Sequence, residues 1–267
     1  MADTFKSEFR SSYNSKMRSK LGLRTEQQED EKLFEELFEA MYETGADFTN
    51  SFRRLSELKF TGQANSANDV AEFLPKIDKE CSSADEYKAF FKPKLPRDTL
   101  DKLIKAVEEE PMVLRYYGLS ERFLENEKLA TAKYDRIRSY GEADKKRVNR
   151  EEWTRWLSKY MQRVYEDERD NIMSSSSESS RVQLMNRHNP RFILRNHVAQ
   201  ACIQEAERDQ LVESHMYLRV LENAFTEAPL SEILVSFDPK LIQMKEESKF
   251  YERPPAPSKC VKLSCSS

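Results

Sequence analysis

Apolar side chains recur every three to four residues through most of the chain, the spacing that gathers them on one face of an α-helix. At the N-terminus the stripe runs in four-residue steps through Phe5, Phe9, Tyr13, Met17 and Leu21. Residues 151–165 carry the stronger stripe Trp153, Trp156, Leu157, Tyr160, Met161 and Val164. Only residues 233–235 suggest a short strand. We therefore predict an all-α fold packed around the Trp153/Trp156 helix, with the N-terminal stripe as an ordinary buried helix.

Glycine is scarce and scattered, and this excludes several enzyme classes. The chain has 5 glycines in 267 residues, and no two are close in sequence. Walker A, dinucleotide-binding, kinase Gly-rich and GxSxG motifs are all absent. The histidines, His188, His197 and His215, are too far apart to form an HExxH pair. The sequence therefore predicts no local phosphate cradle and no metal ligands.

Charge and hydropathy argue against nucleic-acid and membrane partners. The 44 Lys and Arg residues are outnumbered by 47 Asp and Glu residues, giving a formal charge of −3. No apolar run exceeds three residues, far below the length of a membrane span. Four cysteines are too few for a secreted disulfide framework, which favours a reducing compartment. The basic, Ser-containing first 24 residues allow a mitochondrial presequence as the alternative to a structural helix.

Composition suggests four regions. Residues 1–173 are expected to form one helical domain, and residues 174–188 a Ser-rich linker treated as a loop. Residues 189–226 are expected to form a helical hairpin whose first helix has Pro190 in its first turn and ends near Arg208. Residues 227–267 read as an extended, Pro-rich tail that carries two terminal cysteines.

Two polar clusters stand out from this helical background. In the stretch 47–55, Asp47 suits a helix N-cap, or Asp47 and Asn50 contact a ligand or another part of the protein. In the stretch 189–197, Arg191 and Arg195 are expected on one helix face. There they clamp an acidic partner bidentately, or they form a surface salt-bridge ladder.

Two further features concern aromatic and sulfur chemistry. Trp153 and Trp156, taken alone, are core residues. Cys260 and Cys265 lie in the proline-bounded tail, where Lys259 and Lys262 favour the thiolate. They are either a redox pair or two incidental thiols at the terminus.

Five stretches, taken in order, resemble the C-terminal half of the selenoprotein O family. They are residues 13–23, the Asp47–Arg53 motif, Trp153 and Trp156 with Tyr160 and Arg163, the run Asn189-Pro190-Arg191-Phe192-Ile193-Leu194-Arg195-Asn196, and the terminal Cys265-Ser266-Ser267. The run 189–196 is the most specific. Among these residues, Asp47, Asn50, Arg53, Trp153, Trp156, Asn189, Arg191, Arg195 and Asn196 are candidate structural or partner contacts.

The resemblance implies the C-terminal portion of a protein-kinase-like fold that transfers AMP from ATP to Ser, Thr or Tyr hydroxyls of proteins. It also implies a mitochondrial location, with ATP and Mg as cofactors of the full-length family. Cys265 occupies the place where the family has selenocysteine or cysteine, and the resemblance implies a partner thiol for it in the catalytic half. Cys260 departs from the pattern, because it lies five residues before Cys265 rather than three.

The family's nucleotide- and metal-binding residues precede the region that this chain resembles. We therefore expect no catalytic residue and no cofactor in this chain alone, which would be inactive without an N-terminal catalytic half as its partner. The alternative is a non-catalytic helical module that binds other proteins.

Overall fold

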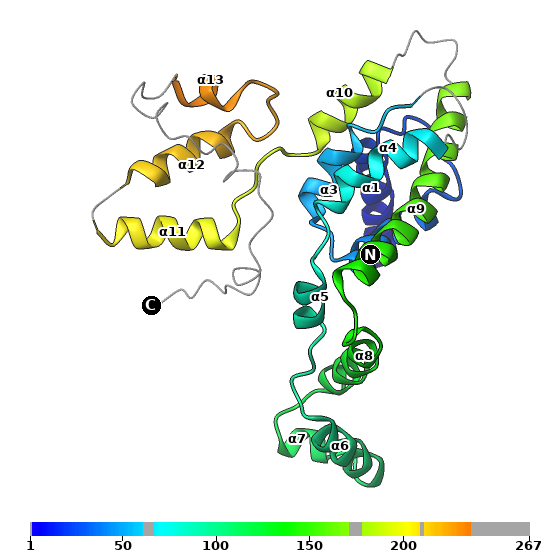
Figure 1. Ribbon diagram of the computed structural model, residues 1–267, viewed down its shortest axis with the longest axis vertical. Coiled ribbons are helices and arrows are strands. Elements are labelled where there is room, and N and C mark those ends of the chain that lie inside the picture. Colours follow the sequence, from blue (N-terminus) through cyan, green and yellow to red (C-terminus); the bar gives the residue numbers. More distant parts are fainter. Residues whose placement is uncertain (1, 61–66, 171–177, 209–210, 236–267) are drawn as a thin grey trace. The chain divides into compact units, whose positions relative to one another are not determined.

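The computed structural model describes residues 2–60, 67–170, 178–208 and 211–235, which contain thirteen α-helices and no strand (Figure 1). The predicted all-α class is confirmed. The chain divides into two compact units: residues 1–81 with 150–267, and residues 82–149. None of the described helices is both long enough and apolar enough to cross a bilayer.

The first unit holds most of the helices. They are α1 (Ala2–Leu21), α2 (Asp30–Thr44), α3 (Phe48–Leu55), α4 (Ala67–Asp78), most of α9 (Glu142–Asp170), α10 (Glu178–His188), α11 (Asn196–Ala206), α12 (Val212–Glu222) and α13 (Leu230–Val235). Helix α1 packs against α2, α3 and α10. Phe192 joins residues of α12 and α13 in a smaller apolar cluster.

In the sequence, the second unit, residues 82–149, is inserted between the two stretches of the first. It contains α5 (Ala84–Phe90), α6 (Arg97–Glu109), α7 (Val113–Tyr116), α8 (Glu121–Ile137) and the first residues of α9. Tyr87, Phe91 and Ile137 form one small core here, and Leu100, Leu114 and Leu124 form another. These units divide the chain after residues 81 and 149, whereas the composition suggests boundaries after residues 173, 188 and 226.

The aromatic face of α9 lies in the largest apolar cluster, as predicted. Trp153 and Trp156 are fully buried, and the Trp156 ring stacks on Tyr160 with centroids 5.0 Å apart. Each polar atom of these rings has a partner. Trp156 Nε1 donates to the Leu33 carbonyl at 2.9 Å, Trp153 Nε1 to Cys81 Sγ at 3.3 Å, and the Tyr160 hydroxyl to the Leu21 carbonyl at 2.7 Å. The α9 face therefore fixes the ends of α1 and α2 as well as burying apolar area.

Local signals set several helix ends. Gly45 follows α2 in the left-handed conformation, with φ 58°, and closes the helix. Ser83 and Glu86 form a capping box at the start of α5. Gly22 follows α1 with φ 73°, and the Leu23 amide reaches back to the Arg18 carbonyl at 2.9 Å.

The N-terminal stripe departs from the prediction. Met17 and Leu21 are buried, but Phe5 and Phe9 are 69% and 62% exposed. The rings of Phe5, Phe9 and Tyr13 stack along the helix at centroid spacings of 6.2 and 6.3 Å. Regular spacing predicted the shared face correctly, but not that only its C-terminal end is covered.

Two secondary-structure predictions are corrected. Residues 178–188, expected to belong to a loop, form helix α10, since Met185 packs into the main core and Arg181 is buried. The strand candidate at 233–235 belongs to helix α13, where Ile233 and Leu234 pack against Phe192 and Met216. In both places tertiary burial outweighs local composition.

Substituting Gly22 tests the tight contact between the end of α1 and α10. A Cβ there would lie 2.6 Å from Arg181 Cγ and 2.9 Å from Met185 Cγ. We expect Gly22→Ala to lower the free energy of unfolding by about 2–5 kcal/mol, from left-handed strain and overpacking together. Urea unfolding followed by far-ultraviolet circular dichroism measures this.

Gly118→Ala is the matched control. Gly118 also has a positive φ, 64°, but nothing lies within 4 Å of its added Cβ. Gly118→Ala should lower the free energy of unfolding only by the cost of the left-handed backbone, about 1–2 kcal/mol. Equal losses for the two variants would contradict the steric explanation.

Candidate functional site

The two polar clusters singled out in the sequence meet in the first unit. Asp47 caps α3 by accepting from the Asn50 amide at 2.9 Å, and it also receives both terminal nitrogens of Arg195, at 2.6 and 3.0 Å. Arg195 Nη2 donates further to Asn50 Oδ1 at 3.1 Å. The paired side chains are only 11% and 10% exposed. The cap and the tertiary contact, posed as alternatives, are therefore both present.

The stretch 190–195 is not helical, which corrects the expected face bearing Arg191 and Arg195. The residue before a proline is pushed away from helical geometry, so α10 ends at His188, and α11 begins only at Asn196. Between them the Arg191 amide donates to the Ala224 carbonyl at 2.6 Å, and Phe192 enters the cluster with Met216. The two arginines thus serve separate sites, and Arg195 is committed to an internal carboxylate.

A buried carboxylate, Glu80, extends this network. Glu80 Oε2 accepts from Asn50 Nδ2 at 2.8 Å, and Oε1 accepts from Arg54 Nε at 2.8 Å. Its own carbonyl accepts from the Asp47 amide at 2.9 Å. Nothing in the sequence marks Glu80 as special, because its partners lie 26 or more residues earlier. It is the principal residue of the site that the sequence analysis missed.

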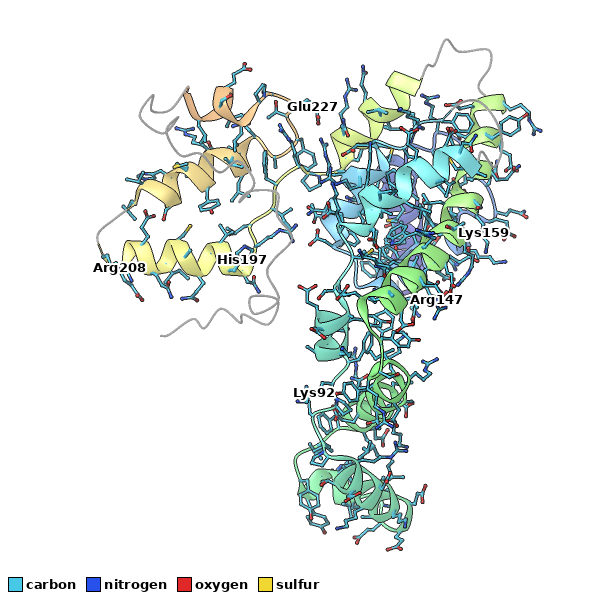
Figure 2. The ribbon with its side chains drawn as sticks, in the orientation of Figure 1. Lys92, Arg147, Lys159, His197, Arg208 and Glu227 are labelled. Atoms are coloured by element: carbon cyan, nitrogen blue, oxygen red, sulfur yellow. The ribbon has the colours of Figure 1, made fainter. Side chains whose placement is uncertain are left out.

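Asn189 and Arg53 connect the α3 motif to α1 and α10. Asn189 is buried, donates from Nδ2 to the Lys20 carbonyl at 2.8 Å, and accepts from Lys20 Nζ at 3.2 Å. Burial lowers the pKa of Lys20. Arg53 donates to the Asn189 carbonyl at 3.3 Å and to the carboxylate of Glu227 at 2.9 and 3.0 Å. Glu227 lies in the connection between α12 and α13 (Figure 2).

A polar groove of about 510 Å³ lies along these residues. Its charged lining consists of three arginines and three glutamates, namely Arg53, Arg54, Arg191, Glu57, Glu80 and Glu227. Asn50, Ser56, Val182 and Asn186 complete the lining. Arg191 also donates from Nη1 to the Ala228 carbonyl at 2.6 Å. The groove is therefore rich in charge but formally neutral.

A second network joins α9 to the loop after α1, and its charged side chains Arg163, Asp30 and Asp167 are buried. Arg163 donates from Nε to Asp30 at 2.7 Å and from Nη2 to the Thr25 carbonyl at 2.7 Å. Asp167 accepts from the amides of Arg24 and Thr25. Burial raises the pKa of the Tyr160 phenol, although the charge of Arg181, 3.2 Å away, acts against this shift. Because Arg163, Asp30 and Asp167 are buried and bonded to Arg24 and Thr25, the network holds the loop after α1 in place.

The remaining predicted site residues lie elsewhere. Trp153 and Trp156 are core residues, and Asn196 is the first residue of α11. Cys260 and Cys265 lie outside the described residues. Partial burial lowers the pKa of His197, and the positive charge of Arg195 lowers it further by a smaller amount. Within the described ranges, no three His, Cys, Asp or Glu side chains are grouped so as to hold a metal ion.

A double-mutant cycle on Asp47 and Arg195 tests the contact between the two motifs. Because both side chains are largely buried and share two hydrogen bonds, we expect a coupling free energy of about 1–3 kcal/mol between Asp47→Ala and Arg195→Ala. Urea unfolding of the four proteins gives the value.

The more exposed pair Arg219–Glu222, 2.8 Å apart with side chains 46% and 48% exposed, supplies the comparison cycle. Its coupling should stay below about 1 kcal/mol. A coupling at Asp47–Arg195 no larger than this would mean that the two motifs are not joined as described.

Comparison with known proteins identifies the lineage of these motifs. The family model described as Protein adenylyltransferase SelO matches residues 1–221. The mitochondrial protein adenylyltransferase SelO of Mus musculus is 30% identical over 226 residues, covering 83% of this chain and 32% of the mouse protein. The Homo sapiens protein of the same name is 31% identical over 182 residues, covering 68% and 27%.

A bacterial relative matches a shorter stretch. Protein nucleotidyltransferase YdiU of Burkholderia pseudomallei is 32% identical over 92 residues, covering 34% of this chain and 16% of the bacterial protein. The chain thus spans about a third or less of the length of the curated relatives it matches. Because the family match extends over more than half of the chain, the protein belongs to the SelO family of protein adenylyltransferases.

Proposed function

We propose that this chain forms the C-terminal helical part of a SelO-type protein adenylyltransferase, which transfers AMP from ATP to Ser, Thr or Tyr hydroxyls of proteins. The family match over residues 1–221 carries the proposal. A kinase-like fold for the whole enzyme, and a mitochondrial location like that in the names of the mouse and human relatives, belong to the same proposal.

The groove and the turn at Gly22 do not suit ATP with Mg. A triphosphate needs an excess of positive charge or clustered amides, whereas the arginines of the groove are matched by equal numbers of glutamates. The positive-φ Gly22 offers no cradle either, since Arg181 and Met185 fill the space above it. This supports the proposal that AMP transfer needs a separate catalytic region, and that the chain alone is inactive.

Labelled ATP tests whether AMP transfer needs a catalytic region outside this chain. This chain, incubated with ATP labelled on the α-phosphate, Mg and an acceptor protein, should transfer no label, because its charge-balanced groove does not suit a triphosphate. A fusion of the catalytic region of the mouse relative to this chain should transfer label, and the mouse protein itself is the positive control. Label transfer by this chain alone would contradict the assignment.

The terminal cysteines are proposed to carry the redox chemistry. The sequence places Cys265 and Cys260 beside Lys259 and Lys262, which favour the thiolate. By contrast, Cys81 is buried, with its Sγ 3.3 Å from Trp153 Nε1 and 3.4 Å from the Ile77 carbonyl. Cys202, on α11, is partly buried.

Limited alkylation at neutral pH checks this order of reactivity. We expect Cys265 to be labelled first and Cys260 second, followed by Cys202, with Cys81 protected until the protein unfolds, because alkylation needs an accessible thiolate. Peptide mass mapping over time gives the order, and a sample in denaturing urea shows that all four thiols can react. Early labelling of Cys81 would contradict the structure, and Cys265 reacting last would contradict the redox proposal.

The alternative function, a helical module that binds other proteins, is favoured by one observation. The stacked rings of Phe5 and Phe9 form an exposed aromatic stripe on α1, in register with the buried Met17. Isolated exposed apolar residues are common, but a stacked run of them is typical of a surface that another protein covers. AMP transfer and protein binding alike require other proteins as partners.

A further inference from the structure

The outer carboxylate of the groove is held weakly, whereas the arginine beneath it is well anchored. The side chain of Glu227 is 55% exposed and that of Arg53 only 17%. Arg53 also keeps a second contact, to the Asn189 carbonyl. An ion pair with one exposed partner contributes little to stability, so Glu227 can be replaced on Arg53 at small cost.

The groove lining also includes a residue whose acceptor has no donor. Asn186 Oδ1 is buried and has no hydrogen-bond partner in the structure. Asn186 and Val182 are four residues apart on α10, and both line the groove with Arg53. A buried carbonyl oxygen left without a donor is unfavourable. A ligand whose N–H pairs with this oxygen, as the Asn186 side chain turns into the groove that it lines, gains binding free energy.

The charge balance of the groove depends on Glu227. Glu80 is matched by Arg54 and Asn50, and Glu57 by Arg54 and Lys76. Since the lining has three arginines and three glutamates, moving Glu227 aside leaves one positive charge in excess. The groove then favours an anionic ligand.

We propose that this groove binds an acidic segment of another protein, in which a carboxylate takes the place of Glu227 on Arg53 and a main-chain N–H donates to Asn186 Oδ1. A carboxylate suits the Arg53 guanidinium, and the amide that the same segment carries suits Asn186. A volume of about 510 Å³ is within the usual range of ligand sites.

Glu227 is then a built-in competitor for the site. Arg191 fixes the turn that carries it, through its amide to the Ala224 carbonyl and its guanidinium to the Ala228 carbonyl, both at 2.6 Å. The turn keeps the Glu227 carboxylate within reach of Arg53 and raises its local concentration there. An incoming acidic segment must outcompete it, which selects for several acidic side chains over a single one.

Binding of a fluorescein-labelled eight-residue peptide of alternating Glu and Gly, followed by fluorescence anisotropy, tests the inference. Glu227→Gln should tighten binding about three- to tenfold, the effect of removing one exposed competing ion pair. Glu222→Gln is the matched control, because Glu222 is a comparably exposed glutamate paired with Arg219 outside the groove. It should leave the affinity unchanged.

Two further variants test the groove itself. Arg53→Ala should weaken binding about tenfold or more, with Arg155→Ala as the exposed-arginine control. Asn186→Leu should weaken it by about threefold or more without loss of stability, since it removes an acceptor that has no partner. Urea midpoints confirm that each variant is folded.

The inference is overturned if Glu227→Gln binds no tighter than Glu222→Gln, if Asn186→Leu leaves the affinity unchanged, or if a Gln-Gly peptide binds as well as the Glu-Gly peptide. It rests on the proposed functions only in taking a protein as the ligand. Binding is measured without ATP, so a failure of AMP transfer leaves this result intact, and the reverse also holds.

Discussion

The structure of the first unit depends on the burial of the aromatic face of α9. Trp153, Trp156 and Tyr160 fill the centre of the largest core, and their polar atoms are satisfied by groups that lie far away in sequence, such as the Leu33 and Leu21 carbonyls. A ring that is both packed and hydrogen-bonded fixes position and orientation together. The ends of α1 and α2 are thereby set, and with them the loop that receives Arg163 and Asp167.

The functional motifs inherit their geometry from this core. Helix α3 packs with α1 and α10, so Asp47 at its start and Arg53 near its end face partners supplied by the chain after α10. Asp47 and Arg195 are 148 residues apart in sequence but joined by a bidentate ion pair. Asp47, Asn50 and Arg195, which stand out in the sequence, thus bind one another. The groove beside them is lined by Asn50 and by Arg53 of the same helix.

Helix existence could be predicted from the sequence because the signal is local. Apolar spacing indicates the helix over residues 151–165, which lies within α9, and the helix at the N-terminus, which is α1. The failures have a common cause, which is dependence on distant partners. Helix α10 follows a serine run but is anchored by Met185 in the core, and the extended stretch 190–195 depends on Ala224. Likewise, Asp47 and Arg195 were each noticed, yet nothing local shows that they meet, and Glu80 and Glu227 carry no sequence signal.

The hydrogen bond between Trp153 and Cys81 has a topological consequence. Cys81 is the last residue before the second unit, and Trp153 lies just after the chain returns at Arg150. The 68 residues from Ser82 to Asn149 therefore leave and re-enter the first unit at neighbouring points. An inserted segment whose two ends lie side by side can become longer or shorter, or be replaced, without moving the residues that flank it. The first unit can thus tolerate evolutionary change in this stretch while the α9 core and the Asp47–Arg195 junction stay as they are.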